Sequence, residues 1–367
     1  RKRNKFSYWR NNRRIPRNFM KVIDARNVND AILLGVDLFN NAFNYRVQES
    51  RNGTTYEALE PVTTVYRNPC ERVCLIAQRD ANPFFHLIES LWMLDGRKDL
   101  KPLTHFVESM KDFSDDGKSL WGAYGWRWKS YFGRDQLPLI INMLKKDPND
   151  RRAVLQMWDA KYDLNRYGKD VPCNTNIYFK IRDGRLNMTV CNRSNDMLWG
   201  AYGANVVHMS ILQEYMASAI GVGMGVYRQV SDSFHVYLNP VWEKVKDLTI
   251  DPHSFRHLKN PYDTLEGYTP TPLFDDVSMF NSELDRFFSM HPTNIEAHKE
   301  GWHSPIFTDI AIPMLQVHRA YQMKDFKSSY EMLESIKAFD WRAACLNWLI
   351  KREQSYLSKT QKGATHE

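Results

Sequence analysis

The chain has 367 residues, 43% of them hydrophobic and 13% aromatic, so it can bury a substantial core in one large domain or two. No apolar run approaches the ~20 residues needed to span a bilayer, and no apolar stretch follows the basic start at residues 1–5, so we expect neither a membrane protein nor a signal peptide. Five cysteines without metal-ligand spacing favour free thiols, and we expect a cytoplasmic protein without a structural metal.

The net charge of +7 suggests an anionic partner. Part of this charge lies in residues 1–19, which we interpret as a basic, solvated tail. A nucleic-acid-binding protein is the alternative from a different functional class, but it would interleave aromatic residues with the basic run, and the tail holds only Phe6, Tyr8, Trp9 and Phe19. We therefore do not expect nucleic acid as a partner. The more specific interpretation of the net charge is that interior arginines bind a phosphorylated small molecule.

Apolar periodicity and turn signals predict the elements in chain order. The expected elements are a strand over 20–25, helices over 29–41, 82–96 and 136–145, a strand over 153–158, an amphipathic helix over 206–220, a strand over 231–238 and helices over 312–323 and 327–351. Prolines between residues 251 and 272 indicate irregular connections before the last two helices.

The helix over 82–96 carries a candidate acid-base group. Asn82 supplies the cap, the following proline occupies the first turn, and Gly96 ends the helix. Glu89 lies one turn from Phe85 and from Trp92 on an apolar stripe. Desolvation raises the pKa of a carboxyl, so this group is suited to proton exchange near neutrality. A glutamate at the edge of the stripe, reaching water, is the alternative.

A β-hairpin is predicted in the middle of the chain. Apolar and polar residues alternate over 177–181 and 186–190, and the Asp183-Gly184 pair between them is the strongest short-range hairpin signal. Cys173 precedes the first strand and Arg193 follows the second, so the thiol and the guanidinium are expected to be neighbours. A cation stabilises thiolate over thiol, and thiolate is the nucleophile. The sequence therefore predicts a reactive cysteine.

The block from Val171 to Asn205 contains a Pro-Cys pair, Arg-Ser-Asn-Asp twenty residues later, a loop with two glycines and an asparagine. In order and spacing it resembles the centre of the thymidylate synthase family, and within that family the viral deoxyuridylate and deoxycytidylate hydroxymethylases. The resemblance implies an α/β fold with a mixed β-sheet layered with helices. It places the catalytic domain at 20–249, after the tail at 1–19, and leaves 250–367 as a helical extension that we expect to pack on the core.

The resemblance implies roles for particular residues. Cys173 is the nucleophile activated by Arg193, Glu89 moves protons with ordered water, Tyr124 lies near the nucleophile, and Asn205 reads the base. The residues implied to bind the substrate are Arg51, Arg151, Arg152, Ser194, Asn174, His235 and Tyr237, and Asp196 is implied to hold the pterin of 5,10-methylenetetrahydrofolate.

Two of these assignments concern arginine motifs that have plainer interpretations. Arg151 and Arg152 are implied to cross a dimer interface to the partner's phosphate, which makes the protein an obligate homodimer. A charged surface loop is the alternative for this pair, as an exposed turn is for Arg51. His235 would similarly be structural if it stood alone, but Tyr237 lies on the same face of the strand.

The product depends on what reacts with the one-carbon unit at C5. Hydride gives thymidylate, whereas water gives a hydroxymethyl group. Asn174 stands where methyl-forming members usually carry histidine, Met110 stands where they carry a shielding tryptophan, and their closing tail is not recognisable. These departures favour conversion of dUMP to 5-hydroxymethyl-dUMP, with thymidylate synthase and dCMP hydroxymethylase as alternatives. Asn205 favours uracil, because its amide matches O4 and N3–H, but a one-residue longer loop puts Ala204 at the nominal position. A viral enzyme of this kind would work in the host cytoplasm.

Overall fold

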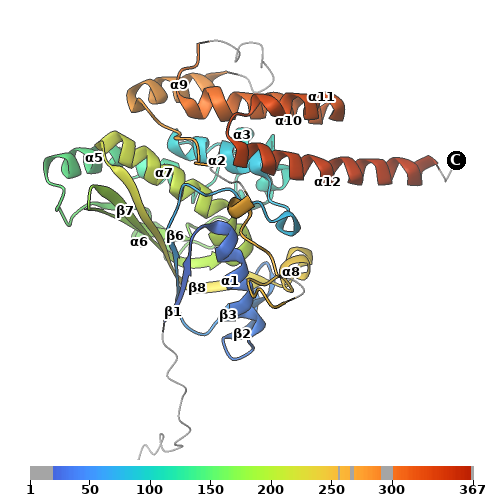
Figure 1. Cartoon of the computed structure of the whole chain (residues 1–367). Helices are drawn as coiled ribbons and strands as arrows, with labels where there is room; N and C mark the ends of the chain where they lie inside the picture. Colours follow the sequence, from blue (N-terminus) through green and yellow to red (C-terminus); the bar gives the residue numbers. More distant parts are fainter. Residues whose placement is uncertain (1–19, 255–256, 265–267, 291–300, 365–367) are drawn as a thin grey trace, which may run out of the picture.

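The computed structural model describes residues 20–254, 257–264, 268–290 and 301–364, so the predicted basic tail lies outside the described residues. A twisted mixed sheet forms the centre of the molecule and helices cover it (Figure 1). In spatial order its strands are β1 (Lys21–Ala25), β4 (Val62–Tyr66), β8 (Gly223–Tyr237), β7 (Arg185–Asp196), β6 (Asn174–Arg182) and β5 (Val154–Gln156), and the hairpin of β2 (Tyr45–Ser50) and β3 (Gly53–Ala58) joins through β3 to β8. The expected α/β fold with a mixed sheet is confirmed.

The predicted hairpin is the pair β6–β7. Asp183 and Gly184 have φ angles of 51° and 68°, as a two-residue turn between right-twisted strands requires. Pairing runs from Arg182 opposite Arg185 to Asn174 opposite Asn192, with a register shift near Asn174. The hairpin thus brings the start of β6 and the end of β7 together, at the end of the hairpin away from its turn.

Helices cover the sheet and each other. The longer ones are α1 (Val28–Asn40), α2 (Pro83–Leu94), α5 (Gln136–Lys146), α7 (Asn205–Ile220), α8 (Pro240–Val245), α9 (Val277–Ser289), α10 (Ile312–Gln322), α11 (Phe326–Met332) and α12 (Phe339–Ala364). Short helical turns are η1 (Ala77–Arg79), α3 (Lys101–Thr104), η2 (Glu108–Phe113), α4 (Tyr124–Trp126), η3 (Arg127–Tyr131), α6 (Ala160–Asp163), η4 (Met197–Ala204), η5 (Pro261–Thr264), η7 (Ile306–Ala311) and η8 (Leu333–Ser335). Asn82 caps α2 as predicted, since its side chain accepts the N–H of Phe85.

Two expectations about helices are wrong. The helix over 206–220 is not amphipathic, because α7 lies between β7, β8 and α2 and is buried almost all round. The helix expected over 327–351 is two helices, α11 and α12, joined by a turn. In this turn Ile336 and Ala338 are fully buried, and Lys337 donates its backbone N–H to the carbonyl of Asp309. The helix is interrupted here because the chain buries both apolar side chains and bonds to Asp309. Apolar periodicity along the sequence does not reveal these contacts.

The segment after β8 returns to the body at several points. Asn260 donates to Asn27 over 3.0 Å, Tyr262 accepts the N–H of Val73, and Glu214 on α7 accepts the N–H of Leu273 over 2.7 Å. Helices α9 to α12 lie together beside α2 and α7, and the last turns of α12 extend beyond the rest of the molecule (Figure 1). Within the described ranges no helix is both long and apolar enough to cross a membrane.

α4 packs closely on α2, and this packing predicts how a substitution in α4 changes stability. A Cβ added to Gly125 would overlap the backbone carbonyl of Met93, which cannot rotate away. We expect Gly125→Ala to lower the free energy of unfolding by about 1–3 kcal/mol, because the two helices must separate. Chemical denaturation measures this loss. Gly223→Ala is the matched control, since its new Cβ would meet nothing nearer than 3.5 Å; an equal loss there would contradict the packing argument.

Candidate active site

Cys173 and Arg193 meet at the open end of the β6–β7 hairpin. The backbone N–H of Arg193 donates to the carbonyl of Cys173 over 2.9 Å, and the Arg193 Nη2 lies 3.9 Å from the Cys173 Sγ. Nε of the same guanidinium donates to the carbonyl of Pro172 over 2.9 Å, which fixes its orientation. The thiol and its expected cationic neighbour are therefore in contact.

Opposing influences act on the thiol. Burial raises the pKa of Cys173 above its ordinary value, the Arg193 guanidinium lowers it, the Asp170 carboxylate raises it and Arg51 lowers it. Asp170 also accepts the backbone N–H of Gly122 over 2.7 Å, and its own pKa is raised by burial. The sequence reasoning missed Asp170, although a carboxylate three positions before the cysteine was a visible signal.

This balance of charges predicts how the thiol titrates. Thiolate is the form that iodoacetamide alkylates, so the rate rises with pH through the pKa of Cys173. We expect Asp170→Asn to shift that rise to lower pH, because a like charge is removed. Arg193→Gln should shift it to higher pH, because the stabilising cation is lost. Alkylation of Cys173 followed by peptide mass across a pH series measures both, and shifts of the same sign in the two variants would contradict the assignment.

Tyr124 and Asn174 lie beside the cysteine. The backbone N–H of Asn174 lies 3.4 Å from the Tyr124 Oη, and burial followed by the neighbouring Cys173 charge raises the pKa of Tyr124 well above its ordinary value. The Asn174 side chain is fully buried, and neither its Nδ2 nor its Oδ1 has a hydrogen-bond partner; Asn192 Oδ1, on the paired position of β7, also lacks one. Buried polar atoms are normally bonded, so these amides suit a polar ligand or solvent.

The predicted phosphate arginines fall into two groups. Arg51 donates to the carbonyls of Gly168 and Lys169 over 3.0 and 2.8 Å, and Arg193 donates to those of Pro172 and Val171. One loop, 168–172, thus collects both guanidiniums next to Cys173. Phosphate oxygens would compete with neutral carbonyls for these donors and form the stronger, charge-assisted bonds.

Arg151 and Arg152 lie in the loop before β5, away from that cluster. Both side chains are exposed, and Arg152 pairs over 2.6 Å with its near neighbour Asp150. In the part of the chain that the structure describes, no bond links either arginine to another predicted site residue. Within one protomer they do not reach the site.

Parallel pairing of β7 and β8 assembles a second group. Asp196 lies opposite His235, and Ser194 lies opposite Ser233. The Asp196 carboxylate accepts the backbone N–H of Tyr237 over 3.4 Å and that of Trp199. Burial raises the pKa of Asp196, and the Trp199 N–H, His235 and Arg79 oppose that rise.

His235 and Tyr237 stand two residues apart, and their rings lie 5.4 Å from each other at right angles. Asn52, next to Arg51, donates to the Tyr237 Oη over 3.5 Å. The ribose pair predicted from the sequence therefore borders the loop that carries a predicted phosphate arginine.

The loop before Asn205 contains one residue more than expected, and its local structure accommodates it. Residues 197–204 form η4, a π-helical segment with Gly203 outside helical geometry. A π-type turn holds an extra residue compared with an α-turn. Asn205 is buried at the start of α7 and donates from Nδ2 to the Asn195 Oδ1 over 3.1 Å. Asn195 donates in turn to Gln229 and Ser231 over 2.8 and 3.0 Å, a hub that sequence reasoning left without a role.

Glu89 lies on α2, where its side chain is buried rather than reaching water from the edge of the stripe. The carboxylate Oε2 lies 3.0 Å from the Nε2 of His208 on α7. His208 was not predicted as a site residue, although it follows Asn205 by one helical turn. The structure brings α2 to the cysteine through Gly125, which contacts Met93, and the adjacent Tyr124.

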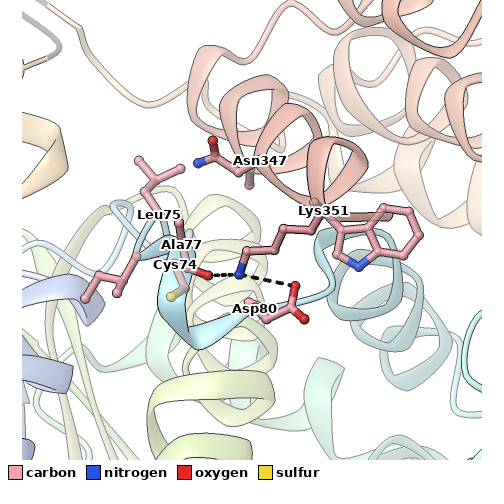
Figure 2. A pocket seen from close by; sticks show the side chains of 10 residues that line it. Cys74, Leu75, Ala77, Asp80, Asn347 and Lys351 are labelled. Carbon is pink, nitrogen blue, oxygen red and sulfur yellow. Dashed lines mark hydrogen bonds and ion pairs between the residues drawn. The ribbon is translucent and has the colours of Figure 1, made fainter. Parts of the chain in front are cut away.

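A small pocket lies apart from these residues, between segment 74–81 and α12 (Figure 2). Lys351 reaches from α12 to the carbonyl of Ala77 and to Asp80. Arg352 also pairs with Asp80, over 3.2 Å. None of the residues that line the pocket is a predicted site residue. These bonds from α12 hold the segment that leads into α2, the helix that carries Glu89.

Comparison with known proteins agrees with this geometry. Residues 38–286 match the family model described as thymidylate synthase. The chain is 46% identical over 347 residues to the deoxyuridylate hydroxymethyltransferase of Pseudomonas phage M6, covering 92% of this chain and 96% of the relative. It is 38% identical over 206 residues to the protein of the same name from Bacillus phage SP01, covering 53% and 54%. It is 32% identical over 200 residues to a putative thymidylate synthase of Methanothermobacter marburgensis, covering 52% and 82%. The chain belongs to the thymidylate synthase family.

Proposed function

We propose that this enzyme transfers a one-carbon unit to C5 of dUMP and completes the reaction with water, giving 5-hydroxymethyl-dUMP. The observation that carries the proposal is the contact of the Cys173 thiol with Arg193 in a chain so similar to the phage M6 deoxyuridylate hydroxymethyltransferase. The enzyme is a one-carbon transferase.

Cys173 makes C5 of the uracil nucleophilic. Its thiolate adds to C6, and the electron pair of the C5–C6 bond moves toward the C4 carbonyl as an enolate. Arg193 favours the thiolate, and Glu89 with solvent polarises the C4 oxygen and moves protons there. Return of the enolate electrons at the end expels the Cys173 sulfur and restores the ring.

The substrate's phosphate binds to Arg51, Arg193 and Ser194, and to Arg151 and Arg152 of the partner subunit. Support comes from the 168–172 loop, which gathers two guanidiniums, and from the exposed pair before β5, which no bond between described residues ties to its own site. His235 and Tyr237 hold the ribose hydroxyl. The protein is then a homodimer with two shared sites.

The one-carbon donor is 5,10-methylenetetrahydrofolate, which family members generally use and which supplies the carbon at the formaldehyde oxidation level. The Asp196 carboxylate, half-buried between β7 and β8, has the acceptor chemistry that a pterin ring N–H requires. Arg79 packs over the exposed Trp199 beside it, at 4.6 Å from the ring centroid. We assign Asp196 to hold the pterin.

Two features favour water over hydride as the final reactant. The unpartnered amide of Asn174 and the unpartnered Oδ1 of Asn192 place polar atoms at the end of the hairpin where Cys173 lies, whereas methyl transfer benefits from excluding water. Both phage relatives named above carry the hydroxymethyltransferase name, while the archaeal relative is named a putative thymidylate synthase. Thymidylate synthase is the second candidate on that last observation. A role in nucleic-acid binding would rest on residues 1–19, which lie outside the described residues.

Product mass tests the function directly. The protein is incubated with 5,10-methylenetetrahydrofolate and either dUMP or dCMP, and the nucleotide is weighed. We expect dUMP to gain a hydroxymethyl group, with tetrahydrofolate released. A methyl gain, with the absorbance of dihydrofolate, would assign thymidylate synthase activity instead, and product from dCMP alone would reassign the base.

Asn205 is expected to set the choice of base. Its one bond to Asn195 leaves the second N–H and Oδ1 of the amide to pair with O4 and N3–H of uracil. Asn205→Asp presents acceptors instead and should move the dUMP:dCMP ratio of kcat/KM toward dCMP by roughly 10²-fold or more. Competition between the two nucleotides measures the ratio. Asn281→Asp, at a residue that bonds Tyr215 outside the site, is the control and should leave the ratio unchanged.

A further inference from the structure

A buried imidazole faces the Glu89 carboxylate. His208 is 3% exposed and Glu89 is 8% exposed, and the two approach to 3.0 Å between Nε2 and Oε2. They are not aligned for a hydrogen bond, so both ring nitrogens of His208 and Oε2 of Glu89 lack a hydrogen-bond partner. Three polar atoms that are buried and unbonded at one contact are unusual in a stable interior, and they have capacity left for solvent or a proton.

His86 and Arg79 are titratable groups in the same part of the interior. His86 lies one turn before Glu89 on α2, and burial lowers its pKa well below the ordinary value, with Arg79 and His208 adding to the effect. Arg79, from η1, is itself buried and donates its Nε to the carbonyl of Leu198. Glu89 and His86 are therefore titratable groups near His208, and the Arg79 cation acts on His86.

Two helices, α7 and α2, connect this pair to the predicted reaction centre. His208 follows Asn205 by three residues on α7, so the two side chains share a face of the helix. Glu89 is on α2, against which Gly125 and Tyr124 pack beside Cys173. The His208 imidazole therefore contacts the proton-moving residue Glu89 and lies one helical turn from the base-reading residue Asn205.

We propose that His208 is a positioning residue for Glu89, which orients this carboxylate as the base for the attacking water. The inference deepens the proposed function and rests on it. In the step concerned, the water oxygen bonds to the exocyclic methylene carbon at C5, and the methylene electron pair moves to O4 as an enolate. The proton of the water passes to Glu89, and the enolate then expels the Cys173 sulfur. A methyl-forming enzyme has no such water to deprotonate.

The experiment separates water capture from the steps before it. With dUMP tritiated at C5, release of tritium reports all steps through loss of the C5 proton, and 5-hydroxymethyl-dUMP reports water capture. We expect His208→Gln to keep the single-turnover burst of tritium within a few-fold of wild type. Formation of the hydroxymethyl product should fall by roughly 10²-fold, the lower range of a general-base contribution.

An added thiol supplies a readout that a merely structural role would not move. A thiolate such as that of 2-mercaptoethanol adds to the methylene carbon without giving up a proton, so it needs no base. We expect it to restore turnover of His208→Gln as the thioether of dUMP. His208→Asn is the second variant if the first does not fold, and His318→Gln is the matched control, a histidine 4% exposed in α10.

Each outcome has one meaning. If His208→Gln reduces tritium release as much as product, or yields no thioether, the inference is overturned while the proposed function stands. If wild type releases no tritium from dUMP in the presence of methylenetetrahydrofolate, the proposed function itself fails. If His318→Gln changes the tritium-to-product ratio as His208→Gln does, the effect is not specific to Glu89.

Discussion

Cys173→Ser is expected to reduce kcat for product formation by at least about 10³-fold, because a serine hydroxyl does not ionise near neutrality as a thiol beside Arg193 can. Binding of dUMP should change little, since the guanidiniums of Arg51 and Arg193 are held by loop 168–172 and not by the sulfur alone. The loss is therefore expected in kcat and not in KM. Steady-state kinetics and the mass of the denatured enzyme–nucleotide adduct measure it.

Cys191 offers a matched control for this substitution. It lies on β7 of the same hairpin and is half-buried like Cys173, and no role is assigned to it. Cys191→Ser should retain the adduct and the turnover. Full activity of Cys173→Ser, or an adduct that maps to Cys191, would remove the nucleophile from position 173 and with it the mechanism.

Replacing Arg151 and Arg152 together by alanine is expected to weaken phosphate binding and lower kcat/KM by roughly 10²-fold or more, since two charge-assisted donors are lost. The physical reason lies in their exposure: among the described residues no bond links either arginine to another predicted site residue, so on our proposal their effect acts through a partner subunit. The effect on stability should be small because the Arg152 side chain is 82% exposed, although that of its partner Asp150 is only 8% exposed. Kinetics and thermal unfolding of the double variant check both statements.

Mixing of inactive variants tests the shared site. In a heterodimer of Cys173→Ser with the double arginine variant, one site has both defects and the other has neither. Random exchange of equal amounts of the two variants makes half of the dimers heterodimers. Each heterodimer has one working site out of two, so about a quarter of wild-type activity should return. Two inactive parents that stay inactive after subunit exchange would refute donation across the interface.

Several features of the fold follow from local sequence. Asp183-Gly184 specifies the turn because both positions need positive φ, and that turn sets the β6–β7 register as far as Asn176 opposite Cys191. Asn82 and Pro83 start α2 for equally local reasons of capping and fixed backbone angle. Counting along the two strands from this turn places Cys173 within one residue of Arg193, and the register shift near Asn174 then brings the two into contact.

Other features depend on what packs against an element. The break between α11 and α12 arises because the chain buries Ile336 and Ala338 and bonds Lys337 to Asp309, which is distant in sequence. The burial of α7 arises because the sheet and α2 enclose it from opposite sides. Neither neighbour is visible in a window of adjacent residues, so periodicity predicted a longer helix in one case and an exposed face in the other.

Sequence alone predicted which reactive groups this candidate site contains, because motif spacing and turn chemistry act over short stretches of chain. It predicted the cysteine, its arginine and the polar block that follows. Tertiary structure decided what surrounds them: Asp170 near the sulfur, the Asn195 hub behind Asn205, and His208 facing Glu89. Charges and hydrogen bonds act through space over a few ångströms, and only the folded chain determines which residues come within that distance.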